Sequence, residues 1–112
     1  MPVTVVALTT IDEDNLEALS TYIGTTGPLL EQANARIVGR YAVGKTIVGV
    51  PNASTVTIVE YPDQAAVDSV FESAEYGWLH EVRAKAFKHY QVMQVEDFAT
   101  QEPLTALTDL VE

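Results

Sequence analysis

VTIVEYPDQAAVDSVFESAEYGWLHEVR, residues 56–83, is the stretch that decides the fold. Apolar and polar residues alternate as far as Tyr61, which is the pattern of a β-strand, and Pro62 then ends the alternation. A short amphipathic helix follows as far as Phe71, and a second helix begins at residues 73–76. The stretch therefore predicts a strand followed by a two-part helix.

Three further strands are predicted around this stretch. Residues 3–9 are β-branched and apolar on both faces, so both faces are expected to be buried. Residues 34–43 alternate with the period of a strand, which places Arg36 and Arg40 on the same face, and residues 89–97 alternate again. With the helix that links the first two strands, the order is βαββαβ. The predicted class is α+β, a ferredoxin-like fold with a four-stranded antiparallel sheet.

The first helix is predicted to kink or break near Gly27. Its start is marked by three consecutive carboxylates, residues 12–14, which complement the helix dipole. Residues 24–28, GTTGP, then combine poor helix formers with a proline. We expect Pro28 to open a second helical segment as its first residue.

Composition limits the class of partner. Six basic residues stand against sixteen acidic ones, a net charge of −10. Such a field repels phosphate backbones and anionic headgroups, so neither nucleic acid nor a membrane is an expected partner. The chain has no cysteine, and its first residues resemble a strand more than a secretory signal. A cytoplasmic location is therefore expected.

A homodimer is expected from the size of the chain and from its first strand. A domain of 112 residues buries only about two-thirds of its unfolded surface. The second apolar face of residues 3–9 also has to be buried, and a partner subunit is the simplest way to bury it. Residues 1–97 are expected to form a single domain. Residues 98–112 form an acidic tail whose leucine spacing fits a short amphipathic helix.

Three polar residues of the second predicted helix are the main candidates for chemistry. Tyr76, His80 and Arg83 stand at i, i+4 and i+7, so they share one helical face. As a site, they would supply catalytic groups in Tyr76 and His80 and a carboxylate-binding cation in Arg83. The same trio also fits a hydrogen-bonded group at a helix–sheet boundary.

Further residues are candidates for ligand binding. They are Arg36, Arg40, Glu60, Tyr22 and Trp78. The two arginines could form an anion site, because guanidinium binds carboxylates through two parallel hydrogen bonds. Glu60 shares a strand face with apolar residues, so it needs an arginine partner or becomes protonated. Tyr22 and Trp78 fit either packing or a pocket wall.

No metal site and no cofactor are predicted. Two distant histidines without cysteine form too small a ligand set for zinc or iron. One axial histidine would suffice for haem, so histidine count alone leaves haem open. The sequence contains no Gly-rich phosphate loop, serine nucleophile motif or dinucleotide fingerprint.

The ordered short motifs of the chain resemble those of the family called domain of unknown function 1330, within the dimeric α+β barrel superfamily. The positions that carry the resemblance are Tyr22, Pro28-Leu29, Arg36, Arg40, Tyr61-Pro62, Ser73-Ala74-Glu75-Tyr76 and Arg83. The resemblance covers residues 3–97. It implies a homodimeric barrel in which two four-stranded sheets face each other, and it implies no specific activity.

Two departures from the family pattern bear on a pocket. Asn34-Ala35 stands where the family has Gly-Gly, and Asn34 tolerates the left-handed backbone conformation that the turn requires. Ile47-Val48-Gly49 stands where the family has Leu-Glu-Gly, which removes a carboxylate. A pocket that relied on that carboxylate would be altered.

Two functions stay open at this point. One is a cofactor-independent enzyme, as in relatives of this barrel, that acts on an aromatic or enolisable substrate in a closed apolar cavity. The other is a non-catalytic dimer that binds a small acidic or aromatic metabolite or has a structural role. An apolar pocket containing Tyr76, His80 and Arg83 would favour a small-molecule role over a structural one.

Overall fold

A computed structural model describes residues 1–96 of the chain, so the helix expected in residues 98–112 lies outside the described residues. The elements are β1 (Val3–Ile11), a 3-10 helix η1 (Glu13–Asn15), α1 (Leu16–Gln32), β2 (Arg36–Ala42), β3 (Thr55–Tyr61), α2 (Gln64–Phe71), α3 (Ala74–Ala86) and β4 (Phe87–Val95). The predicted strand and two-part helix correspond to β3, α2 and α3.

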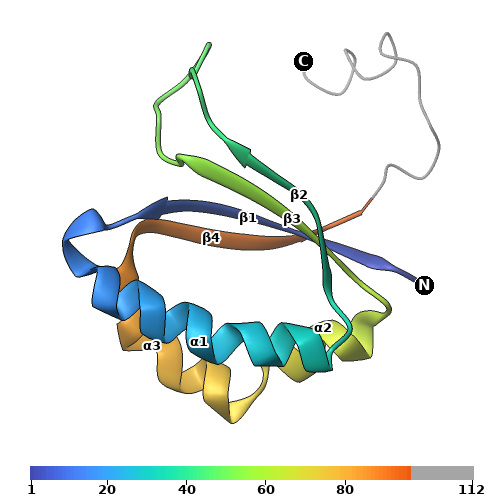
Figure 1. Cartoon of the computed structure of the whole chain (residues 1–112). Helices are drawn as coiled ribbons and strands as arrows, with labels where there is room; N and C mark the ends of the chain where they lie inside the picture. Colours follow the sequence, from blue (N-terminus) through green and yellow to red (C-terminus); the bar gives the residue numbers. More distant parts are fainter. Residues whose placement is uncertain (97–112) are drawn as a thin grey trace, which may run out of the picture.

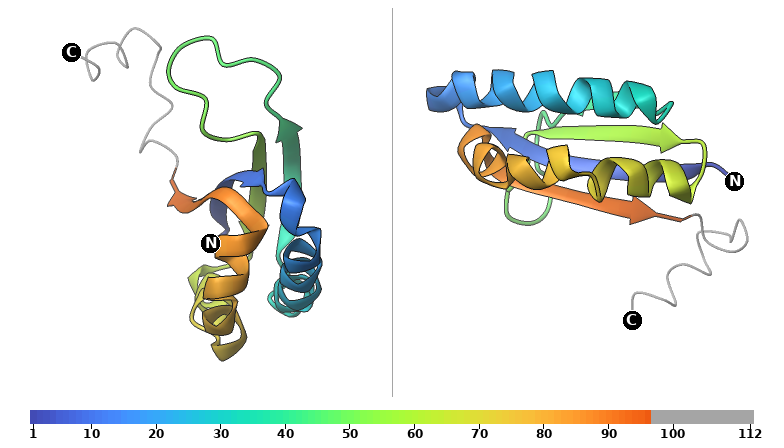
Figure 2. Two further views of the ribbon diagram at one scale, coloured as in Figure 1. Left: turned by 90° about the vertical axis from the view of Figure 1, so that its left-hand side faces the viewer. Right: turned by 90° about the horizontal axis from the view of Figure 1, so that it is seen from below.

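The four strands form one antiparallel sheet in the order β2-β3-β1-β4. All three α-helices lie on the same side of this sheet, with α1 alongside α3 (Figures 1 and 2). The predicted ferredoxin-like βαββαβ arrangement is confirmed. The other side of the sheet, here called the outer face, is covered by none of the described helices.

The two parts of the split helix begin at side-chain caps. The Asp63 carboxylate accepts a hydrogen bond of 2.8 Å from the backbone N–H of Ala66, and the Ser73 hydroxyl accepts one of 3.1 Å from the N–H of Tyr76. Each cap satisfies a backbone donor that the first turn of a helix leaves free. The second cap sets the start of α3, and therefore the direction in which Tyr76 leaves the helix.

A β-bulge in β2 separates the two arginines that were predicted to share a face. Arg36 pairs with Glu60, but the register shifts between Ile37 and Gly39, and Arg40 then pairs with Thr57. An extra residue in a strand reverses the side-chain alternation beyond it. The prediction of a common face was therefore wrong: Arg36 lies on the outer face and Arg40 on the helix side.

Helix α1 runs without interruption through the segment that was predicted to break it. Hydroxyls of Thr21, Thr25 and Thr26 each donate to the backbone carbonyl one turn earlier, at 2.9 to 3.1 Å. The helix also buries Tyr22, whose side chain is 6% exposed, against the sheet side of the molecule. Packing of this face outweighs the poor helix propensity of the segment around Pro28, so the predicted break is wrong.

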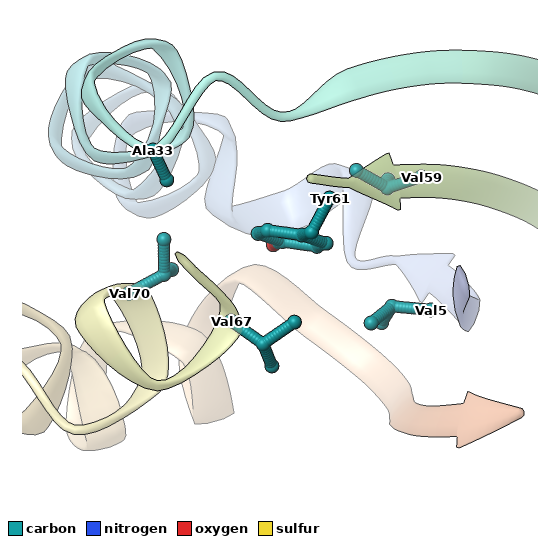
Figure 3. Packing of buried hydrophobic residues seen from close by; sticks show 6 residues of the cluster. All are labelled: Val5, Ala33, Val59, Tyr61, Val67 and Val70. Atoms are coloured by element: carbon teal, nitrogen blue, oxygen red, sulfur yellow. The ribbon is translucent and has the colours of Figure 1, made fainter. Parts of the chain in front are cut away.

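The apolar core lies where α2 and the end of α1 meet the helix side of the sheet (Figure 3). Its buried members are Val5, Ala33, Val59, Tyr61, Val67 and Val70. Tyr61, 1% exposed, lies between the valines of the sheet and those of α2 (Figure 3). Asn34 has a φ of 57° in the turn that follows α1, the left-handed conformation expected for it.

Candidate functional site

A cavity of about 200 Å³ lies between the helix side of the sheet and helices α1, α2 and α3. The sheet contributes small and branched side chains to its floor, and the helices contribute larger ones. Its apolar lining includes Val5, Ala7, Val59 and Val92 from the strands and Leu19, Ile23, Leu30 and Phe71 from the helices. The cavity opens to solvent at Ile23 and Ile37, which are 56% and 53% exposed. A mainly apolar concave space with a few polar groups is the usual form of a small-molecule site.

Three tyrosine hydroxyls meet at one side of this cavity. Tyr22 comes from α1, Tyr76 from α3 and Tyr90 from β4. The Tyr90 hydroxyl is hydrogen-bonded to the hydroxyl of Tyr22 and, at 2.8 Å, to that of Tyr76. We call these three residues the tyrosine network. Because its members come from three different elements, the hydroxyls are held in place by the fold itself.

Burial raises the pKa of Tyr22, Tyr61 and Tyr90 and so favours their neutral forms. Desolvation, reinforced by the neighbouring Tyr90, holds the pKa of Tyr22 well above its ordinary value. Desolvation likewise raises the pKa of Tyr90, although the Arg83 charge acts in the opposite direction. Tyr61 also lines the cavity, and desolvation followed by the proximity of Tyr76 raises its pKa to about 12. These groups are hydrogen-bond donors near neutral pH and do not act as phenolate bases.

Arg83 lies against the tyrosine network rather than in the cavity wall. Its Cζ is 5.2 Å from the ring centroid of Tyr76 and 5.2 Å from that of Tyr90. Its Nη2 donates to Nδ1 of His80 at 3.3 Å, and its Nη1 is buried with no hydrogen-bond partner among residues 1–96. The guanidinium thus stacks on the two phenols and is oriented by them.

The predicted trio of α3 is only partly brought together. Tyr76 lines the cavity, whereas His80 is exposed and contacts Arg83 outside it. Trp78 is 74% exposed and is not among the lining residues. Of the predicted residues on this helix, Tyr76 alone reaches the cavity.

Arg40 is the only charged side chain among the described residues that line the cavity. Arg36 instead forms an ion pair of 2.7 Å with Glu60 on the outer face. Glu60 was expected to require an arginine partner, and Arg36 is that partner. The bulge in β2 therefore gives the two arginines different roles: one pairs with a carboxylate, and the other faces the cavity.

The described residues offer neither a metal cluster nor a membrane span. No group of three or more His, Cys, Asp or Glu residues within residues 1–96 could hold a metal ion. Within the same residues, no helix is both long and apolar enough to cross a bilayer.

The family described as "Domain of unknown function (DUF1330)" matches residues 4–98. The chain belongs to this family. The match covers all the elements except Val3, the first residue of β1, and it includes all the residues of the cavity. The tyrosine network is therefore part of the DUF1330 domain. A comparison with curated proteins finds no significant match.

Solved structures with this fold come from several bacteria. A protein of unknown function from Rhodopseudomonas palustris has a TM-score of 0.72 and 19% identity, covering 88% of this chain and 84% of that one. A dimeric ferredoxin-like protein of unknown function from a Jannaschia species has a TM-score of 0.61 and 8% identity, with coverages of 87% and 100%. An ethyl tert-butyl ether D (EthD) family protein from Bacillus halodurans has a TM-score of 0.57 and 19% identity, with coverages of 88% and 100%. At these identities the likeness concerns the fold alone.

Sequence reasoning missed two of the cavity tyrosines of this DUF1330 protein, Tyr61 and Tyr90. The alternation of β4 already placed Tyr90 on the same face as Val92, but nothing in that pattern indicated what the face would meet. The structure shows that tyrosine is concentrated at the cavity. Four of the five tyrosines of the chain line the cavity, and only Tyr41 does not.

Proposed function

We propose that this DUF1330 protein is a homodimer that binds a small, mainly apolar molecule in the cavity between sheet and helices. The observation that carries the proposal is the cavity itself, of about 200 Å³ and lined mostly by apolar side chains. A dry cavity of about 150 Å³ is large enough for benzene. The expected ligand is therefore the size of one substituted aromatic ring.

The homodimer is supported by the outer face of the sheet. This face is apolar along its central strands, with Val6 and Leu8 of β1 beside Ile58 and Val56 of β3. A sheet with helices on one side only is stabilised when a second layer covers the other. Two structural neighbours are described as dimeric ferredoxin-like proteins. A second copy of the chain is the cover that fits both observations.

Binding fits the cavity better than catalysis does. Enolisation or cofactor-independent oxygenation requires a group that removes a proton from the substrate. The lining within residues 1–96 includes no carboxylate and no imidazole. Burial raises the pKa of its phenols Tyr22, Tyr61 and Tyr90, so they do not act as bases near neutral pH. His80 is exposed and paired with Arg83, and we assign it no catalytic role.

A cavity-filling variant tests the proposal. Ala7 lies in the middle of the cavity floor, so Ala7→Leu adds three carbons to the space a ligand would occupy. Ala65→Leu makes the same change at an exposed position of α2 and is the matched control. Both variants and the unchanged protein would be screened against single-ring aromatic compounds by thermal denaturation and calorimetry.

Compounds that bind in the cavity should stabilise the unchanged protein and Ala65→Leu. A compound at 100 times its Kd stabilises a protein by about 2.7 kcal/mol. The same compounds should fail to stabilise Ala7→Leu. Equal stabilisation of all three proteins would place binding elsewhere, and a screen without any binder would refute the proposed function.

A further inference from the structure

We propose that the ligand is an aromatic carboxylate that carries a hydrogen-bond acceptor, such as a ketone oxygen, at its opposite end. Arg40 would pair with the carboxylate, and the tyrosine network would donate to the acceptor. This inference rests on the proposed function, because it assigns the two polar ends of the same cavity.

The tyrosine network has more protons than it uses. Three phenols have three O–H donors, and the two hydrogen bonds between them consume two. Among the described residues these hydroxyls bond only to one another. One O–H is therefore free to donate at the point where the three hydroxyls meet, beside the cavity. A buried donor that lacks an acceptor costs free energy, so a ligand that supplies the acceptor gains affinity.

Arg83 strengthens this donor. Its guanidinium stacks on the rings of Tyr76 and Tyr90, each 5.2 Å from the Cζ. A positive charge beside a phenol increases the acidity of its O–H and hence its strength as a donor. The network is thus suited to a carbonyl oxygen, which accepts hydrogen bonds and offers no proton in return.

Arg40, the charged residue of the cavity lining, lies at the end opposite the tyrosine network. Arg40 is in β2 and Tyr90 in β4, the two edge strands of the sheet, and these strands are three strand spacings, about 14 Å, apart. Tyr90 lies two residues along β4 from Val92, which is in the same row as Arg40. The chain as a whole has a net charge of −10 and repels anions. A single arginine facing an apolar cavity in such a chain is therefore a selective position for one carboxylate.

The floor between the two ends is apolar. Thr57, Ala7 and Val92 form the row of paired residues that leads from Arg40 toward β4. Apart from the Thr57 hydroxyl, this row offers no polar side chain. Small side chains here leave a flat space that suits an aromatic ring. The three parts together define a ligand with an acid, a ring and an acceptor in line.

The acceptor end is tested with two probes of the same shape. 4-Acetylbenzoate carries the acid and the ketone, and 4-isopropenylbenzoate replaces the ketone C=O by C=CH₂. One net hydrogen bond predicts that the protein binds the acetyl probe about 3- to 10-fold more tightly in calorimetry. The triple variant Tyr22→Phe, Tyr76→Phe, Tyr90→Phe removes every hydroxyl of the network without orphaning one, and should bind both probes equally.

Tyr61→Phe is the control for the acceptor end, because Tyr61 lines the cavity outside the network. It should keep the preference for the acetyl probe. If the triple variant does not fold, as judged by circular dichroism, Tyr90→Phe replaces it with the opposite expectation. It leaves the hydroxyls of Tyr22 and Tyr76 without their shared partner, so the preference for the acetyl probe should rise, and a preference that does not rise counts against the network. A preference that persists in the triple variant, or that vanishes in Tyr61→Phe, overturns the role of the network.

The acid end is tested with acetophenone, which lacks the carboxylate. Arg40→Gln should weaken binding of 4-acetylbenzoate about 5- to 10-fold and should leave binding of acetophenone unchanged. The expected effect is smaller than that of a buried charged hydrogen bond because Arg40 is exposed to solvent. Arg36→Gln on the outer face is the matched control and should change neither. An equal effect of both arginine variants would overturn the role of Arg40.

Binding in the cavity and recognition of the two polar ends of the ligand are tested separately. If the aromatic screen finds binders that Ala7→Leu excludes but the acetyl and isopropenyl probes bind equally, the cavity is a binding site and the present inference is wrong. The inference is also wrong if such binders exist and none of the three probes binds at millimolar concentration. A screen without binders removes the proposed function itself.

Discussion

The guanidinium of Arg83 lies over the ring of Tyr90, with its Cζ 5.2 Å from the ring centroid, and contacts Tyr76 in the same way. Arg83 is thereby separated from the cavity by the phenols that it holds. Arg83, which the sequence predicted to bind a ligand directly, thus lies behind two of the residues that line the cavity.

Arg83→Ala should lower thermal stability and leave the contact between ligand carboxylate and protein intact. Loss of the stacking on Tyr76 and Tyr90 is expected to cost about 0.5–2 kcal/mol. Arg83→Lys keeps the charge but lacks the planar group, so its thermal stability should lie between those of the unchanged protein and Arg83→Ala. Melting temperature and the affinity ratio of 4-acetylbenzoate to acetophenone, measured on each variant, check this. An unchanged melting temperature with a reduced affinity ratio would mean that Arg83 binds the ligand carboxylate directly.

Ile58→Asp should convert the homodimer into a monomer. Ile58 pairs with Val6 in the middle of the outer face, so a carboxylate there would be buried without a partner in the dimer. Light scattering of the purified variant measures the mass. Leu16→Asp, at an exposed position of α1 on the helix side, is the control and should stay dimeric. The proposed interface is wrong if Ile58→Asp is still a dimer.

Stability should fall at alkaline pH because of the buried phenols. The pKa of Tyr61 is raised from 10.0 to about 12 in the folded chain. The contribution of Tyr61 to the free energy of unfolding is fully present below pH 10. It is lost as pH rises toward 12, because in this window only the unfolded chain releases the phenol proton. Tyr22 and Tyr90 act in the same direction.

Urea denaturation at a series of alkaline pH values measures this loss, and Tyr61→Phe should reduce it. Absorbance of tyrosinate in the folded protein provides an independent check. If all five tyrosines ionised near pH 10 without unfolding, the burial of these phenols would be disproved.

Gly27→Ala should stabilise the chain by about 0.5–1 kcal/mol. Gly27 lies inside α1, and a Cβ built there meets no atom within 4 Å. Alanine therefore reduces the freedom of the unfolded chain without a clash. Gly49→Ala is the opposite case, because Gly49 has a φ of 99° that alanine adopts only with strain. Thermal denaturation of both variants should show shifts of opposite sign, and a destabilised Gly27→Ala would mean that α1 is interrupted there.

Local patterns were sufficient for most of the fold. The alternation that ends at Tyr61 and the cap at Ser73 depend on neighbouring residues only, so β3, α2 and α3 follow from the chain itself. The prediction of an interruption at Gly27 was wrong because it considered local signals only. Its local signal was real, but the face of α1 that carries Tyr22 gains more from packing than the segment loses in propensity.

The candidate site depended on distant contacts. Alternation along β2 could not reveal the bulge between Ile37 and Gly39, because a bulge is defined by the pairing with β3. This bulge decides which arginine faces the cavity. The tyrosine network joins residues 68 and 14 positions apart, so no local pattern relates them. Short-range periodicity thus determined the elements, and short ordered motifs carried the resemblance to the family. The tertiary structure alone decided which hydroxyls and which cation share one apolar cavity, because strand register and helix packing place residues that the sequence keeps apart.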